Sequence, residues 1–199
     1  MMPTVAIFDA LAVGNNLENR LQDFARGEVQ LFCYLACLLS LYDSNPTAFW
    51  KYNFIKNELG SPYSESVDKA INNLIYRNEI VEKPDGYLNI SSLGHSTYAS
   101  LSSFYMYEQR SKYINVACES IKSLPFGFVR DAINNEPILK GVRSLPEARI
   151  LNDEQSASIQ VLYNQFHNLK IALESKYDDL LIPALVWINY LIKQSKIAS

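Results

Sequence analysis

The chain has 199 residues, 48% of them hydrophobic, and a formal net charge of −3. This composition excludes a disordered chain and is sufficient for the core of one domain or two small ones. Non-specific DNA affinity depends on Lys and Arg side chains that neutralise phosphates. Because the chain is acidic overall, it lacks the strong excess of basic residues that is typical of an autonomous DNA-binding protein.

The first half of the chain shows helical patterns separated by turn residues. After a mixed start, we expect a short helix at Leu17–Phe24 and a central buried helix at Glu28–Tyr42, which is apolar almost all round. The stretch Asp43–Pro46 breaks this helix. Asn45 is suited to cap a further helix that begins with Pro46 and runs to about Leu59.

A third helix is expected to start near Ser64 and to end at Asn78. It has one apolar face, formed by residues that recur at spacings of three and four: Val67, Ala70, Ile71, Leu74 and Ile75. Two short strands follow at Ile80–Lys83 and Tyr87–Ile90, around the turn Pro84–Gly86.

This order of elements predicts a mostly α chain with a small β-hairpin. We interpret 28–94 as a winged helix-turn-helix domain, preceded by an N-terminal extension (1–27) and followed by a helical region (95–199). The segment Ala70–Gly94 resembles the recognition helix and wing of many winged-helix proteins. In those proteins the second strand of the wing is followed by a short sequence motif similar to Ile90–Gly94.

The helical region is expected to contain four further helical segments. They lie at 95–122, at about Gly127–Asn135, from Asn152 or Asp153 to about Lys176, and at Leu180–Lys193. The third has apolar residues at alternating spacings of three and four, but over too few heptads for a sustained coiled coil. A degenerate second winged helix in this region stays open, because the sequence shows no second wing.

The cysteines and the N-terminus predict a reduced, cytoplasmic protein. Cys33 and Cys37 lie one helical turn apart in an apolar run, where buried free thiols are expected. Residues 1–4 carry no charge before a short apolar stretch, which argues against a signal peptide. The apolar runs Val29–Tyr42 and Leu180–Ile192 are shorter than the roughly 20 residues of a membrane span, so we expect no membrane contact.

No pattern in the sequence indicates catalysis. It lacks a Gly-rich phosphate loop and the motifs GxSxG, CxxC and HExxH. His95 and His167 are far apart and match no zinc spacing. We therefore expect no enzymatic activity, no metal and no cofactor.

Two sets of residues are candidates for binding. On the outward face of the third helix and on the wing, the candidates for contacting duplex DNA are Lys69, Asn72, Asn73, Arg77 and Lys83. Glu65 and Asp68 oppose this role, because they put negative charge where DNA would lie. In the apolar C-terminal helices, the candidates for contacting a protein partner are Phe166, Leu169, Trp187 and Tyr190.

The winged-helix segment, together with Tyr34–Leu39 and Ala48–Tyr52, resembles the small middle components of bacterial three-component systems built around an SMC-like ABC ATPase, such as Lamassu-type anti-phage systems. The resemblance covers about 28–94. In related SMC complexes, small winged-helix subunits bind a kleisin or the ATPase. Those of the KITE class carry two winged helices, whereas one is visible here. The resemblance implies a scaffold that links an ATPase to an effector nuclease.

Two hypotheses for function follow. The preferred one is a non-catalytic accessory subunit that binds an SMC-like ATPase and an effector in a defence complex directed against phages or plasmids. The alternative is a winged-helix transcriptional regulator that binds duplex DNA and dimerises through its C-terminal helices.

Overall fold

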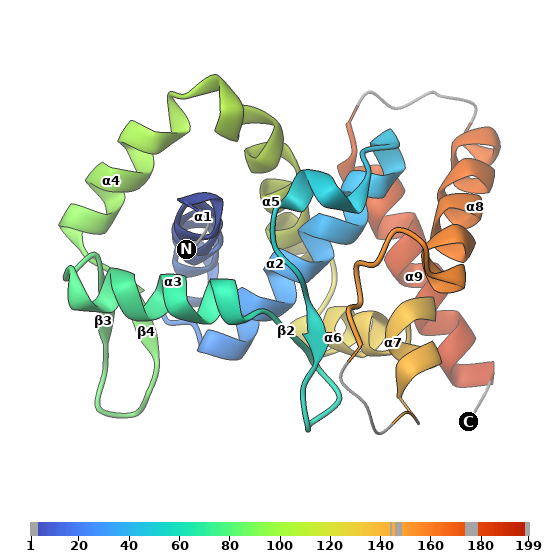
Figure 1. The fold of residues 1–199 in the computed structure, drawn as a ribbon, viewed down its shortest axis with the longest axis horizontal. Helices are drawn as coiled ribbons and strands as arrows, with labels where there is room; N and C mark the ends of the chain where they lie inside the picture. Colours follow the sequence, from blue (N-terminus) through green and yellow to red (C-terminus); the bar gives the residue numbers. More distant parts are fainter. Residues whose placement is uncertain (1–3, 144, 146–148, 174–178, 198–199) are drawn as a thin grey trace.

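The computed structural model describes residues 4–143, 145, 149–173 and 179–197. This part of the chain is mostly helical, with two small antiparallel hairpins. Figure 1 shows the first helix near the centre of an arch that is formed by α2, α3, α4 and α5, and all four helices contact it.

The central helix, α1 (Thr4–Leu21), is much longer than expected. The predicted helix at Leu17–Phe24 was therefore wrong in its bounds, since Phe24 lies beyond the end of α1 in extended backbone. Gly14 allows α1 to approach the rest of the fold closely. A Cβ atom at Gly14 would lie 2.8 Å from Phe24 Cζ and 2.8 Å from Ile90 Cδ1.

The second helix, α2 (Arg26–Ser40), confirms the predicted central buried helix. Its residues from Val29 to Ser40 are all buried. The Glu28 carboxylate accepts a hydrogen bond from the Ala25 N–H at 2.7 Å, which satisfies a backbone donor at the start of the helix. A short 3₁₀ turn, η1 (Leu41–Asp43), follows it.

The predicted helix at Pro46–Leu59 was wrong. This segment forms a 3₁₀ turn, η2 (Thr47–Trp50), and then extended backbone that leads into a hairpin of β1 (Ile55–Lys56) and β2 (Pro62–Tyr63). Lys51 has a φ of 67°, which ends the turn. The side chain of Asn152, which is distant in the sequence, holds the extended backbone after the turn. It donates a hydrogen bond to the Tyr52 C=O at 3.0 Å and accepts one from the Phe54 N–H at 2.9 Å.

The predicted third helix and hairpin are confirmed. The helix α3 (Glu65–Tyr76) is followed by β3 (Ile80–Glu82) and β4 (Leu88–Ile90), with Val81 opposite Asn89. Phe24 and Leu88 exchange two backbone hydrogen bonds, so one residue of extended chain lies beside β4 as a third, minimal strand.

The region expected to be one helix at 95–122 consists of two, α4 (Ser92–Ser102) and α5 (Tyr105–Ser123). The predicted short helix is present as α6 (Phe126–Asn134), and α7 (Pro137–Val142), which was not predicted, follows it. Glu136 caps α7 with its side chain, an arrangement that sequence spacing did not indicate.

The last two helices are α8 (Ala157–Ala172) and α9 (Leu181–Ile197). The side chain that caps α8 belongs to Ser156, whose hydroxyl accepts from the Ile159 N–H at 3.2 Å, so neither Asn152 nor Asp153 has that role. The predicted end at Lys176 lies outside the described residues. Within those residues, the strand pairing that follows β4 is limited to one bridge, between Ile150 and Ile55.

Buried side chains from α1 to α9 form one continuous hydrophobic cluster. The division into 1–27, 28–94 and 95–199 stays a prediction, but α1 belongs to the core that the following helices share. None of the described helices combines the length and the apolar character that crossing a membrane requires.

Candidate functional site

The outward face of α3 and the β3–β4 hairpin form one surface, which we call the α3–hairpin surface. It carries the five candidate residues for contacting DNA. Lys69, Asn72 and Arg77 are exposed, whereas Asn73 and Lys83 are half-buried. The apolar face of α3 is turned to the core, where Val67, Ile71 and Leu74 are fully buried.

Every candidate cation on this surface is paired with a carboxylate. Lys69 Nζ lies 2.6 Å from Glu65, and the hydrogen bond between them lowers the pKa of the Glu65 carboxyl and raises that of the lysine. Arg77 Nη2 lies 2.7 Å from the buried carboxylate of Glu79.

The hairpin shows the same pairing. Lys83 Nζ lies 2.7 Å from Asp23, and its hydrogen bond is the main cause that lowers the pKa of this carboxyl. Arg26, at the start of α2, lies 3.2 Å from Glu82 and 3.8 Å from Asp68. Cations that are already neutralised gain less from phosphates, because contact with DNA would break these pairs.

The Asn72 amide is also engaged in contacts within the surface. The Asn72 Oδ1 atom accepts from Arg26 Nη1 at 2.7 Å, and its Nδ2 group donates to Asp68 at 3.3 Å. The charged side chains of α3 and the hairpin, with the two that pair with them from outside, comprise more acids than bases. The acids are Asp23, Glu65, Asp68, Glu79, Glu82 and Asp85, and the bases are Arg26, Lys69, Arg77 and Lys83.

Large side chains with apolar groups project from the same surface. Tyr76 at the end of α3 is 86% exposed, Val81 on β3 is 50% exposed, and Tyr87 next to β4 is 46% exposed. Tyrosine combines a large apolar ring with a polar tip, and it is enriched where proteins contact one another. Sequence reasoning placed Tyr76 on the outward face of the third helix without giving it a role, and it did not single out Val81 or Tyr87.

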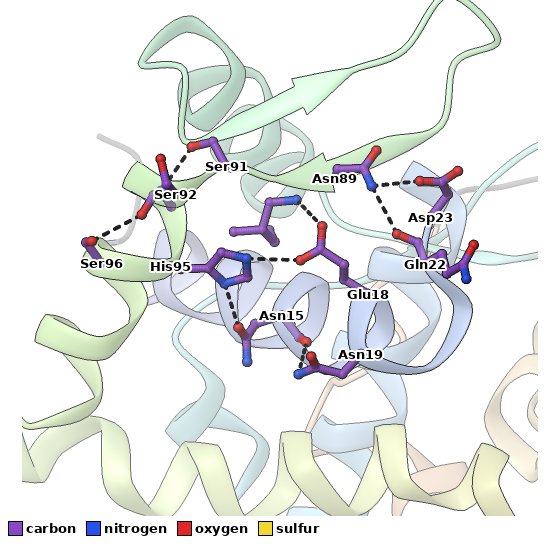
Figure 2. Close-up of polar contacts among 12 residues, drawn as sticks. Asn15, Glu18, Asn19, Gln22, Asp23, Asn89, Ser91, Ser92, His95 and Ser96 are labelled. Atoms are coloured by element: carbon purple, nitrogen blue, oxygen red, sulfur yellow. Dashed lines mark hydrogen bonds and ion pairs between the residues drawn. The ribbon is translucent and has the colours of Figure 1, made fainter.

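A polar network, which the sequence also did not indicate, fixes the hairpin on α1. Figure 2 shows the His95 ring between Asn15 and Glu18, with Nδ1 3.0 Å from Asn15 Oδ1 and Nε2 3.2 Å from Glu18 Oε2. Glu18 also accepts from the Ile90 N–H at 3.0 Å. This network positions the hairpin.

The second half of the network lies at the end of α1. Asn89 on β4 donates to the Gln22 C=O at 3.0 Å and to Asp23 at 2.7 Å. Because Asp23 also binds Lys83, which directly follows β3, one carboxylate joins both arms of the hairpin to the end of α1. The arrangement of the α3–hairpin surface is therefore tied to the core on two sides.

The second set of candidates lies at the other end of the fold. Leu169, Trp187 and Tyr190 line a groove of about 320 Å³ between α8 and α9. Phe166 is buried beneath it, with its ring centroid 5.0 Å from that of Trp187. The structure thus brings together all four residues that the sequence proposed for contact with a partner.

Comparison with family models, with curated proteins and with solved structures gave no match.

One cluster of ionisable groups, around Asp9 and Arg110, is buried in the core. The Arg110 guanidinium on α5 makes a bidentate ion pair with Asp9 on α1, and Tyr52 donates to the same carboxylate at 2.6 Å. The guanidinium also stacks on the Trp50 ring, with Cζ 4.1 Å from its centroid. Asp9 is 0% and Arg110 2% exposed, so this cluster links α1, η2 and α5 and is closed to a substrate.

The thiols are likewise buried. Desolvation raises the pKa of Cys118 to about 12 and raises the pKa values of Cys33 and Cys37, which keeps these groups protonated and poorly nucleophilic. Among the described residues, no three His, Cys, Asp or Glu side chains are grouped so that they could hold a metal ion.

Proposed function

We propose that this chain is a non-catalytic accessory subunit that binds another protein through its α3–hairpin surface. The observation that carries the proposal is the pairing of every candidate cation there with a carboxylate: Lys69 with Glu65, Arg77 with Glu79, and Lys83 with Asp23. A surface that has already neutralised its own cations, and that has acids in excess, is poorly suited to a polyanion.

We further propose that Thr4–Ile90 is a winged helix-turn-helix domain. The supporting order is α1, the single-residue strand at Phe24, α2, α3 and the β3–β4 hairpin. In this interpretation α1 is the first helix of the domain, and the segment 41–64 is an insertion before the helix that reads DNA in many relatives of this fold.

The chemistry of the surface favours a partner with basic and apolar groups. Its excess of acids attracts Lys and Arg side chains, and the exposed rings of Tyr76 and Tyr87 offer apolar area and stacking faces for them. The resemblance to middle components of SMC-like systems makes an SMC-like ABC ATPase and an effector nuclease the partners that we propose, within the cytoplasm.

The test is co-expression of the tagged chain with the products of the genes adjacent to its own, followed by size-exclusion chromatography. We expect an adjacent ATPase to elute with the chain, and the double variant Tyr76→Ala, Glu82→Lys to lose most of this association. The matched control is Tyr105→Ala at the start of α5, because Tyr105 is 80% exposed outside this surface. Elution of the wild-type chain without any adjacent product would overturn the proposal, as would equal association of the double variant.

The alternative, a DNA-binding regulator, has one observation in its favour. Asn72 is exposed on α3, and an amide on such a helix is able to read an adenine edge once its hydrogen bonds to Arg26 and Asp68 are broken. This function requires affinity for duplex DNA that falls with rising salt and falls again when Arg77 or Lys83 is replaced by Ala.

A further inference from the structure

The outward face of α8 and α9 is almost free of charge. Of the residues in 157–172 and 181–194, none of the exposed side chains is Asp, Glu or Arg, and Lys193 is the one exposed lysine. A solvent-facing protein surface normally consists of Asp, Glu, Lys and Arg for about a quarter to a third of its residues. The exposed large apolar residues of the two helices are Val161, Ile171, Ile182, Val186 and Tyr190.

This face is hollowed between the two helices. The groove of about 320 Å³ has Leu169 and Ala172 on α8 and Val186, Trp187 and Tyr190 on α9 as its apolar lining. The Trp187 indole N–H is satisfied within the fold, because it donates to Gln165 at 3.1 Å. The groove therefore presents apolar area, bordered by amide side chains.

The charge pattern favours a second copy of this chain as the occupant. In a symmetric pair each face meets itself, so a charged face would place like charges opposite each other, whereas an uncharged face does not. The groove residues Gln165 and Asn168 have amides that both donate and accept hydrogen bonds, which makes them complementary to their own copies. A partner selected by charge would find little to recognise here.

We infer that two copies of the chain associate through α8 and α9, whose four helices form a bundle around a two-fold axis. The helices have 16 and 17 residues, and at 1.5 Å per residue each is about 25 Å long. Two such helix pairs form a four-helix bundle, with the exposed apolar side chains of one copy in the groove of the other.

This face lies far from the α3–hairpin surface, so the dimer leaves that surface exposed. Figure 1 shows α8 and α9 at the edge of the molecule opposite α4 and the β3–β4 hairpin. A dimer would then present two α3–hairpin surfaces that point away from each other. The inference does not depend on what those surfaces bind.

The test measures the oligomeric state of the full chain by sedimentation equilibrium from about 1 to 100 µM, a range that spans ordinary dimer affinities. We expect a dimer for the wild type, and at least a tenfold weaker association for Tyr190→Glu. That substitution buries an unpaired carboxylate of each copy in the apolar interface. The variant Ile171→Glu, at a site that is 62% exposed, should weaken association in the same way with little risk to folding.

The matched control is Tyr105→Glu, which makes the same change at a residue that is 80% exposed on α5. This variant should dimerise like the wild type, and circular dichroism confirms that each variant is folded. A wild-type chain that is monomeric at 100 µM would overturn the inference. So would folded Tyr190→Glu and Ile171→Glu variants that associate as strongly as the control.

Discussion

Lys83 and Asp23 lie 60 positions apart in the sequence, yet the lysine Nζ atom is 2.7 Å from both carboxylate oxygens of the aspartate. The pair joins the turn of the hairpin to the end of α1. It also removes from the hairpin the positive charge that a wing uses against a phosphate backbone. A hairpin that is held by an acid in this way is suited to contacting protein.

Removing the paired acids should create affinity for DNA. The triple variant Asp23→Asn, Glu65→Gln, Glu82→Gln releases the cations that these groups neutralise. All three side chains are at least partly exposed, and the Asn and Gln amides keep an oxygen that accepts hydrogen bonds. We expect it to bind duplex DNA at about 50 mM salt, with a slope of about −3 in log K against log salt for three released cations. Fluorescence anisotropy of a labelled duplex measures this.

The control for this experiment makes the same change in net charge elsewhere. The variant Glu58→Gln, Glu108→Gln, Asp153→Asn replaces exposed acids outside the surface. If it gained as much affinity for DNA as the first triple variant, net charge would explain the effect and local pairing would not.

Gly94→Ala should destabilise the fold strongly. A Cβ atom at this position would lie 2.1 Å from the Glu79 carbonyl oxygen, which accepts a backbone hydrogen bond from Ser91 at 3.0 Å. We expect the free energy of unfolding to fall by about 2–3 kcal/mol, measured by urea denaturation. The control Gly127→Ala has nothing within 4 Å of the new Cβ. It should leave stability unchanged or raise it by up to about 1 kcal/mol, and an equal loss in both variants would contradict this explanation.

The Asp9–Arg110 pair should behave as a buried ion pair. Asp9→Asn leaves the guanidinium without a counter-charge in a site that is 2% exposed, so we expect a loss of about 3–5 kcal/mol in the free energy of unfolding. The double variant Asp9→Leu, Arg110→Met removes both charges and should recover much of that loss. The double-mutant cycle consists of the single variants Asp9→Leu and Arg110→Met and this double variant, and additive effects in it would contradict coupling of the two side chains.

The elements that the sequence predicted correctly are those whose signals are local. The apolar stretch of α2, the apolar face of α3 at spacings of three and four, and the turn Pro84–Gly86 are each contained within a few neighbouring residues. The acidic net charge of the chain also predicted that little positive charge is available to bind DNA. The pairing of Lys83 with Asp23 shows how such a charge is neutralised in the folded chain.

The segment 46–59 was predicted wrongly because its apolar residues imitate a helical spacing. Their positions are set by partners far away in the sequence: Arg110 binds the Phe49 C=O at 3.1 Å and the Trp50 C=O at 3.3 Å. Contacts over 60 positions leave no local pattern. Similarly, Gly14 suggests a break in the sequence, yet it lies within α1, where it allows Phe24 and Ile90 to approach.

The candidate surfaces were predicted in part. The apolar patterns of the last helices led to Phe166, Leu169, Trp187 and Tyr190 as candidates, whereas the groove that three of them line between α8 and α9 was not predicted. The periodicity of the third helix placed Tyr76 on its outward face, but the exposed side chains Val81 and Tyr87 were missed, since a short strand beside a turn gives no local sign of which side chains are buried. Exposure depends on the packing of α1 and α4 around α3 and the hairpin.

Glu136 should make stability depend on pH. Desolvation raises the pKa of this buried carboxyl from 4.5 to about 7, although it accepts hydrogen bonds from the backbone of α7 and from Tyr34. Between these two values the unfolded chain releases a proton that the folded chain keeps, so this contribution to stability is complete below the lower value and is lost as the pH rises towards the upper one. The full effect is about 3 kcal/mol.

Urea denaturation at pH 5 and at pH 8 measures this dependence. We expect the wild-type chain to lose more stability between the two pH values than Glu136→Gln does, because a neutral amide has no proton to release. A variant with the same pH dependence as the wild type would contradict the assignment of this titration to Glu136.

Titration of a labelled duplex with the wild-type chain at about 50 mM salt tests most directly whether the α3–hairpin surface is adapted to protein in place of DNA. The pairing of its cations predicts no measurable binding under these permissive conditions. Binding that weakens with added salt, and that Arg77→Ala and Lys83→Ala each reduce, would contradict the account.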